Sequence, residues 1–164
     1  MGARELRTKN LTLRPNTLED IRTLLEGMDA DQRAQVSPDW LARVHAATAD
    51  AWPLGYTLVR RATEAVVGSC GFKGPPTSDG IVEIAYGVAA DHQGRGYATE
   101  AAEALAAYAF SSGEVRVVRA HTFSDASGST RVLEKCGFRR IGEVLEPEDG
   151  LVVRWEKHGR PLLS

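Results

Sequence analysis

One segment, VEIAYGVAADHQGRGYATEA at residues 82–101, constrains the fold of this chain more than any other. Its apolar first half predicts a strand, a glycine-containing loop follows at 93–98, and the alanine-rich end predicts a helix. The first N–H groups of a helix lack acceptors within the helix, and the helix dipole adds partial positive charge there. Glycines let the backbone approach a phosphate closely. The segment therefore predicts a site for a phosphate-bearing cofactor in the middle of the chain.

Length and composition exclude several other classes of protein. With 164 residues the chain is long enough for a sizeable core, and we expect one domain over residues 1–164. The net charge of -2 provides no basic field, so nucleic acid is not an expected partner. Cys70 and Cys136 are too few for a disulfide framework and lack metal-site spacing, so we expect no metal. We find no signal peptide and no apolar run of about 20 residues, so we expect no membrane partner and, by default, a cytoplasmic location.

Hydrophobic periodicity and turn residues predict an alternation of strands and helices. Thr17 and Asp20 resemble a capping box at the start of the first helix, with Asp in place of the usual Glu. Because strands and helices are mixed along the chain, we expect one mixed α/β domain. In order, we expect a strand at 10–14, helices from 18 and at 38–51, strands at 56–61, 65–72 and 81–89, a helix at 97–111, a strand at 115–122, a helix at 127–135, and strands at 138–144 and 151–157.

The glycine loop does not fit the two best-known phosphate-binding motifs. The Walker pattern GxxxxGK[ST] is absent from the chain. A dinucleotide fingerprint needs a third glycine where Thr99 stands, and an acidic residue at the end of the next strand, which here ends in Ala120-His121-Thr122. Taken alone, the glycines are explained equally well by a plain strand-to-helix turn.

Two sequence blocks together support a more specific interpretation. The pattern Gln93-x-x-Gly96-x-Ala98 after a strand resembles the pyrophosphate-binding motif of the GNAT superfamily of acetyltransferases. Downstream, STRVLEKCGF at 129–138 resembles the second conserved block of that superfamily, in the form found in the branch related to ribosomal-protein N-terminal acetyltransferases. The opening LTLRP and the closing DGLVVRWE fit the same branch. One departure is Ala126, which stands where this branch commonly has Asn and leaves the local cofactor contacts open.

The resemblance implies both a fold and an activity. The fold is α/β (α+β), with a single mixed, mostly antiparallel central sheet, splayed middle strands and flanking helices. The activity is transfer of an acetyl group from acetyl-coenzyme A, the co-substrate, to a primary amine by direct transfer in a ternary complex. The acceptor is either a protein N-terminus or a small-molecule amine. A homodimer is an open alternative to a monomer, since dimers are frequent in this family.

The resemblance also implies which residues contact the cofactor. The backbone of the strand end contacts the pantetheine arm, and the N–H of Val88 is the expected donor to the thioester carbonyl. The loop and the helix start contact the pyrophosphate. The full implied set is Val88, Ala89, Gln93, Gly94, Arg95, Gly96, Tyr97, Ala98 and Thr99.

Two side chains are the expected catalytic groups. Glu83 interrupts an apolar strand and matches a Glu of this branch, so it is our candidate general base, directly or through water; the alternative is a solvated strand Glu. Ser129 matches the serine of the second block and is the candidate proton donor to the leaving sulfur. Equally, it could satisfy N–H groups at a helix start. His121 could act in acid–base chemistry, but a structural role is the stronger expectation for a single histidine. Tyr86 either lines the acceptor pocket or packs in the core.

Other functions stay open at this point. The two cysteines lack the His partner of a nucleophile, so a covalent acetyl-cysteine route is not expected. The main alternative is a non-catalytic module that binds or senses acetyl-coenzyme A. A more remote alternative is a nucleotide-binding α/β domain.

Overall fold

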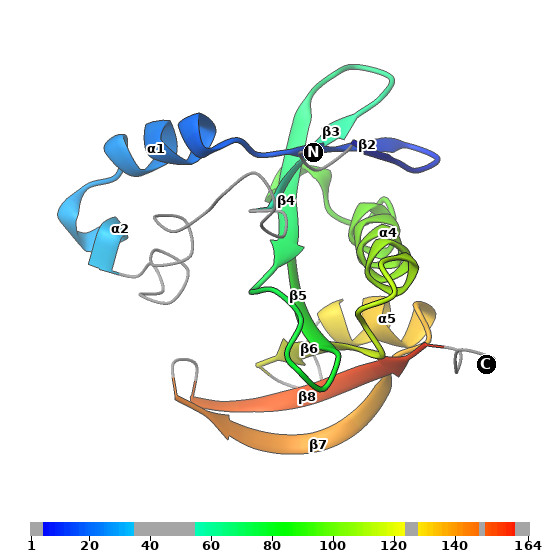
Figure 1. The fold of residues 1–164 in the computed structure, drawn as a ribbon. Helices are drawn as coiled ribbons and strands as arrows, with labels where there is room; N and C mark the ends of the chain where they lie inside the picture. The colour runs from blue at the N-terminus through cyan, green and yellow to red at the C-terminus, as the bar shows by residue number, and fades with distance from the viewer. Residues whose placement is uncertain (1–4, 35–54, 124–127, 148–149, 160–164) are drawn as a thin grey trace.

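The protein is described by a computed structural model, which covers residues 5–34, 55–123, 128–147 and 150–159 (Figure 1). The helices of these ranges are α1 (Leu18–Glu26), α2 (Ala30–Ala34), α4 (Tyr97–Ser111) and α5 (Gly128–Lys135), with a 3-10 turn at Ala90–His92. The strands are β1 (Leu6–Arg7), β2 (Leu11–Pro15), β3 (Tyr56–Arg60), β4 (Val66–Phe72), β5 (Ile81–Val88), β6 (Val117–Thr122), β7 (Arg139–Glu146) and β8 (Gly150–His158).

The eight strands that the structure describes belong to one sheet, in the order β1-β2-β3-β4-β5-β6-β8-β7. Neighbouring strands are antiparallel except β5 and β6, which run parallel. In Figure 1, α1 and α2 lie to one side of β4 and β5, and α4 lies to the other. The expected mixed, mostly antiparallel sheet with flanking helices is therefore confirmed.

The two parallel strands separate soon after they begin. β5 and β6 pair at Ile81 with Val117, Val82 with Val118 and Glu83 with Arg119, and the described residues show no pairing beyond these three. β5 nevertheless continues to Val88. This is the splay between middle strands that the resemblance to the GNAT superfamily implies.

The ladder between β4 and β5 leaves backbone groups facing the splay. Val88 lies opposite Gly68, and the N–H of Ala89 donates to the carbonyl of Val67 at 2.8 Å. This pattern marks Val88 and Gly68 as a non-hydrogen-bonded pair, whose own N–H and C=O groups point away from each other. The backbone of Val88 therefore faces the gap that opens toward β6.

Side chains alternate along β5 between two different environments. Val82 and Ile84 are both 2% exposed and lie in the core beneath α4. Because successive side chains of a strand point to opposite faces, Glu83 points to the other face of the sheet. The core that fixes this orientation is made of buried aliphatic side chains, including Leu11, Leu13, Leu58, Val67, Val118, Leu105 and Leu133.

The N-terminal helices agree only in part with the helices predicted from the sequence. The capping box at α1 is confirmed, because Asp20 N donates to Thr17 Oγ1 at 3.0 Å and Thr17 N donates to Asp20 Oδ2 at 2.9 Å. The short helix α2 was not predicted, although Asp29 and Gln32 exchange the same two bonds at 2.8 and 3.0 Å. The helix expected at 38–51 lies outside the described residues.

The strand boundaries differ from expectation by a few residues. β6 begins at Val117 rather than at 115, β7 extends to Glu146, and β8 runs from Gly150 to His158. β1 was not predicted, because two residues are too few to show the alternation of apolar and polar side chains that marks a strand. Among the helices that the structure describes, none has the length and apolar character to cross a membrane.

Candidate active site

A cavity of about 530 Å³ borders the end of β5 and the starts of α4 and α5. Its wall combines backbone from the splayed strand with the glycine loop and one face of α5. The cofactor residues expected from the sequence that line it are Val88, Gln93, Gly94, Gly96, Tyr97, Ala98 and Thr99. Ala89 and Arg95 are not part of this wall: the N–H of Ala89 is used in the sheet, and Arg95 is exposed on the loop.

The loop presents an anion site at the start of α4. Gly94 and Gly96 have φ values of 80° and 84°, in the left-handed region that favours glycine. Gly96 is the N-cap and provides no side chain to cap the helix. The first helical bond runs from Glu100 N to Gly96 O at 3.1 Å, so the N–H groups of the first helical residues have no acceptor within the helix.

The loop surface is open enough for a ligand to approach. A Cβ built on Gly94 or Gly96 would meet no atom of the described residues within 4 Å. The side chain of Gln93 holds the loop against the strand, since its Nε2 donates to the carbonyl of Val88 at 3.0 Å. Strand end, loop and helix start thus form one connected concave surface.

The residues that carry a hydroxyl group and line the cavity include one on α5 and one on β5. Ser129, in the first turn of α5, and Tyr86, on β5, both line it. The Tyr86 hydroxyl is buried and has no hydrogen-bond partner of normal geometry among the described residues. Burial raises the pKa of Tyr86 to about 12, and the adjacent Ser129 hydroxyl offsets part of that rise. Tyr86 therefore stays protonated at neutral pH and has a proton to donate.

Two cations in the wall of the cavity were not predicted from the sequence. Arg131 and Lys135 both line it and are both exposed. They are four residues apart on α5, so they occupy the same face of that helix. That spacing was visible in the sequence, but only the docking of α5 shows that this face looks toward the glycine loop.

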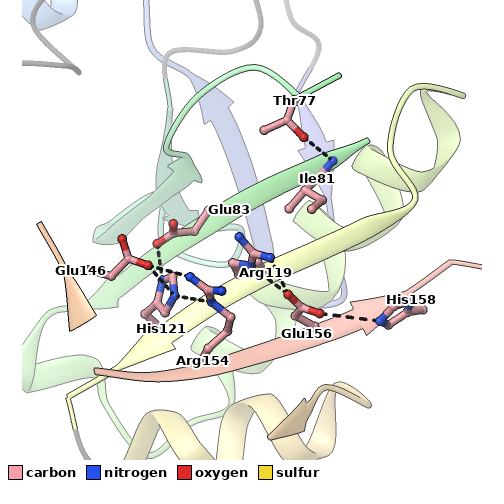
Figure 2. Close-up of polar contacts among 9 residues, drawn as sticks. All are labelled: Thr77, Ile81, Glu83, Arg119, His121, Glu146, Arg154, Glu156 and His158. Atoms are coloured by element: carbon pink, nitrogen blue, oxygen red, sulfur yellow. Dashed lines mark hydrogen bonds and ion pairs between the residues drawn. The ribbon is translucent and has the colours of Figure 1, made fainter. Parts of the chain in front are cut away.

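Glu83 belongs to a separate polar cluster on the other face of the sheet (Figure 2). Its Oε2 lies 2.9 Å from His121 Nδ1 and 3.0 Å from Lys73 Nζ. On the far side of the ring, Arg154 Nε donates to His121 Nε2 at 3.1 Å, and Arg154 Nη2 donates to Glu146 Oε1 at 2.8 Å. The structure thus brings together two residues that the sequence suggested for acid–base chemistry, Glu83 and His121, and places Ser129 elsewhere.

The cysteines are buried and remain thiols. Burial raises the pKa of Cys70 to about 12 and that of Cys136 to about 11, so neither is a thiolate at neutral pH. The described residues contain no group of three or more His, Cys, Asp or Glu side chains that could hold a metal ion.

A sheet that opens between two parallel strands, with a glycine loop and a free helix N-terminus at the opening, defines the class of acetyltransferases that the second sequence block also indicates. The Acetyltransferase (GNAT) domain family matches residues 10–139. The chain belongs to this GNAT family of acetyltransferases.

Comparison with individual relatives agrees with this assignment. The chain is 35% identical over 89 residues to N-acetyltransferase YjdG of Bacillus subtilis, covering 54% of this chain and 51% of that protein. It thus matches about half the length of that relative. It is 25% identical over 148 residues to N-acetyltransferase p20 of Bacillus licheniformis, covering 84% of this chain and 83% of the relative.

Solved structures share the fold over nearly the whole chain. A GNAT-family acetyltransferase from Bordetella pertussis superposes with a TM-score of 0.68 at 27% identity, covering 94% of this chain and 99% of that one. The ribosomal alpha-N-protein acetyltransferase RimL, solved with coenzyme A, gives 0.70 at 16% identity, covering 94% and 98%. A chimera of the spermidine N-acetyltransferase SpeG of Vibrio cholerae gives 0.68 at 19% identity, covering 92% and 96%.

Proposed function

We propose that residues 1–164 form one catalytic domain that transfers an acetyl group from acetyl-coenzyme A to a primary amine. The observation that carries this proposal is the cavity at the end of β5, where the glycine loop and the free N–H groups of α4 lie beside unpaired strand backbone. In this proposal the transfer is direct, in a ternary complex, and the buried thiols of both cysteines argue against a covalent acetyl-cysteine intermediate.

The pyrophosphate binds at the start of α4. The N–H groups of Tyr97, Ala98 and Thr99 have no acceptor among the described residues, and the dipole of this 15-residue helix favours an anion there. Arg131 and Lys135 face the same cavity and neutralise further phosphate charge. These contacts account for the recognition of a ligand that carries several phosphates.

The pantetheine arm lies along the free edge of β5. The backbone of Val88 faces the splay, so its N–H can donate to the arm or to the thioester carbonyl. A fixed N–H aimed at that carbonyl stabilises the oxyanion that develops when an amine attacks.

Glu83 is the general base in this proposal, and Ser129 supplies the proton to the departing thiolate. Glu83 points away from the α4 face, so the amine reaches the thioester from the side of the sheet opposite the cofactor cavity. Ser129 lies in the cavity beside the protonated Tyr86 hydroxyl, which can replace the proton that the serine gives up.

The acceptor is a primary amine, and both classes suggested by the sequence remain candidates. The fold neighbours include a protein N-terminal acetyltransferase, RimL, and a spermidine acetyltransferase, SpeG. A screen that measures thiol release with peptides, polyamines, amino acids and aminoglycosides would separate the two classes.

The first test is calorimetric titration with acetyl-coenzyme A, coenzyme A, ATP and NAD. We expect binding of the two coenzyme A species alone, followed by amine-dependent thiol release. Tight binding without release with any amine would favour the non-catalytic alternative. No binding of coenzyme A would overturn the site assignment.

A further inference from the structure

His121 is held on both ring nitrogens (Figure 2). Nε2 accepts a hydrogen bond from Arg154 Nε at 3.1 Å, and Nδ1 lies 2.9 Å from Glu83 Oε2. A guanidinium has donors only and stays charged in proteins, so Nε2 must offer its lone pair to Arg154. A carboxylate has acceptors only, so Nδ1 must carry a proton to bond Glu83. Only one form of the ring satisfies both contacts, which is the neutral imidazole with its proton on Nδ1.

We propose that Arg154 fixes His121 as this neutral Nδ1–H tautomer and thereby makes His121 a positioning residue that orients Glu83, rather than a base. Its role in catalysis rests on the proposed function, in which Glu83 takes the proton of the amine. The tautomer itself does not depend on that function.

The surrounding charges are paired in a way that keeps Arg154 in place. Glu146 Oε1 binds Arg154 Nη2 at 2.8 Å and lies farther, at 3.4 Å, from His121 Nε2. Lys73 sits on the other side of Glu83, at 3.0 Å from Oε2. Glu146 therefore anchors the guanidinium that occupies the lone pair of the ring.

The neighbouring charged residues on β6 and β8, Arg119 and Glu156, bind each other. Arg119 Nε and Nη2 bind Glu156 Oε2 at 2.9 and 2.7 Å. His158 Nε2 lies 3.7 Å from Glu156 Oε1. Glu156 is thus engaged with its own partners, and the ring of His121 is left to Glu83, Arg154 and Glu146.

This arrangement explains why His121 cannot itself accept the proton of an amine. Its Nε2 lone pair is occupied by Arg154, and its Nδ1 proton is donated to Glu83. Lys73 and His121 both contact the Oε2 atom of Glu83. The carboxylate is held by that oxygen, and Oε1 is the atom that faces the amine in this proposal.

The tautomer can be measured directly by long-range ¹H–¹⁵N NMR of protein labelled on histidine nitrogen, without any substrate. The chain has four histidines, and the signal lost in His121→Asn assigns the ring. We expect a protonated Nδ1 and an unprotonated Nε2 at neutral pH. An Nε2–H ring or an imidazolium would overturn the proposal. Arg154→Met removes the donor to Nε2 while Glu83 still requires the proton on Nδ1, so Nε2 should gain a proton beside Glu146 and the ring should become an imidazolium. An unchanged spectrum would show that Arg154 does not set the tautomer.

Kinetics tests the positioning role separately. In His121→Asn the side-chain amide N–H can replace the Nδ1–H donor, whereas His121→Ala removes it. We expect the Ala variant to lose about tenfold or more in kcat at unchanged KM for acetyl-coenzyme A, and the Asn variant to recover most of that loss. Equal inactivity of both variants would mean that the ring moves a proton itself. His158→Ala is the control, since that side chain is 63% exposed and touches neither Glu83 nor Arg154. If no amine supports turnover, the NMR result still decides the tautomer.

Discussion

Gly96 and Gly113 stand at the two ends of helix α4 in the same left-handed conformation, with φ values of 84° and 79°. A Cβ on either residue would meet no atom of the described residues within 4 Å. Only Gly96 borders the cavity. The two glycines therefore allow the backbone cost of a substitution to be separated from its effect on binding.

Gly96→Glu should abolish binding of acetyl-coenzyme A, because it places a side chain and a negative charge where the pyrophosphate binds. Gly113→Glu should cost a similar amount of stability, about 1 kcal/mol from the left-handed backbone, and leave binding intact. Calorimetric titration and thermal unfolding of both variants provide the comparison. Unchanged affinity in Gly96→Glu would refute the assignment of the pyrophosphate site.

Glu83→Gln tests the general base. The amide keeps the shape of the side chain and cannot accept a proton, so kcat should fall about 100-fold while the Kd for acetyl-coenzyme A stays the same. Glu156→Gln is the control. Glu156 is also a half-buried carboxylate, but its partner is Arg119 and it does not belong to the Glu83 cluster. Full turnover in Glu83→Gln would leave Glu83 as a solvated strand residue.

Tyr86→Phe tests the proton supply to the leaving thiolate. Loss of the hydroxyl should lower kcat about tenfold with little change in cofactor affinity. The matched control is Tyr56→Phe, which removes another buried hydroxyl without a partner in the described residues, outside the cavity wall. If Tyr86 and Ser129 act as a unit, adding Ser129→Ala to Tyr86→Phe should lower kcat no further. Additive losses would show that they act independently.

Arg131→Ala and Lys135→Ala should each weaken coenzyme A binding, by about tenfold, because each removes a cation from the cavity wall. The loss should shrink as ionic strength rises, since salt screens exposed charges. Arg139→Ala removes an exposed cation of β7 that lies outside this wall and serves as the control. Equal effects of all three substitutions would indicate a general charge effect rather than a site.

Glu100→Gln tests a structural carboxylate that ties α4 to the N-terminal strands. Asn10 N and Nδ2 donate to it at 2.9 and 2.8 Å, and Thr8 Oγ1 donates as well. Although burial opposes the charge, these bonds together lower the pKa of Glu100 below its ordinary value of 4.5. We expect a loss of about 1–3 kcal/mol in the free energy of unfolding at neutral pH.

The pH dependence of that loss has a definite sign. A carboxyl pKa that is lower in the folded than in the unfolded state stabilises the fold above the unfolded value and loses this contribution as the pH falls through the folded value. The difference in stability between wild type and Glu100→Gln should therefore be full at neutral pH and shrink below pH 4.5. Denaturant unfolding over that range measures it, and a difference independent of pH would exclude the ionised carboxylate as its source.

Local features of the fold were predictable because their signals are contiguous in the chain. The glycine loop before α4 and the capping box at Thr17 each need only neighbouring residues. The cluster around His121 was not predictable, because its members lie on β5, β6, β7 and β8. Its geometry requires β8 to insert between β6 and β7, so that Arg154 lies opposite His121. Nothing local in the sequence specifies that order.

The early separation of β5 from β6 has a further consequence for the protein without its co-substrate. Past Glu83 the sheet carries an open edge, and unpaired strand backbone is a template for pairing with another chain. An arm lying along that edge would occupy it and also stabilise the folded state by mass action. The ligand-free protein is therefore expected to be the aggregation-prone form, so its lifetime in solution should depend on the supply of acetyl-coenzyme A.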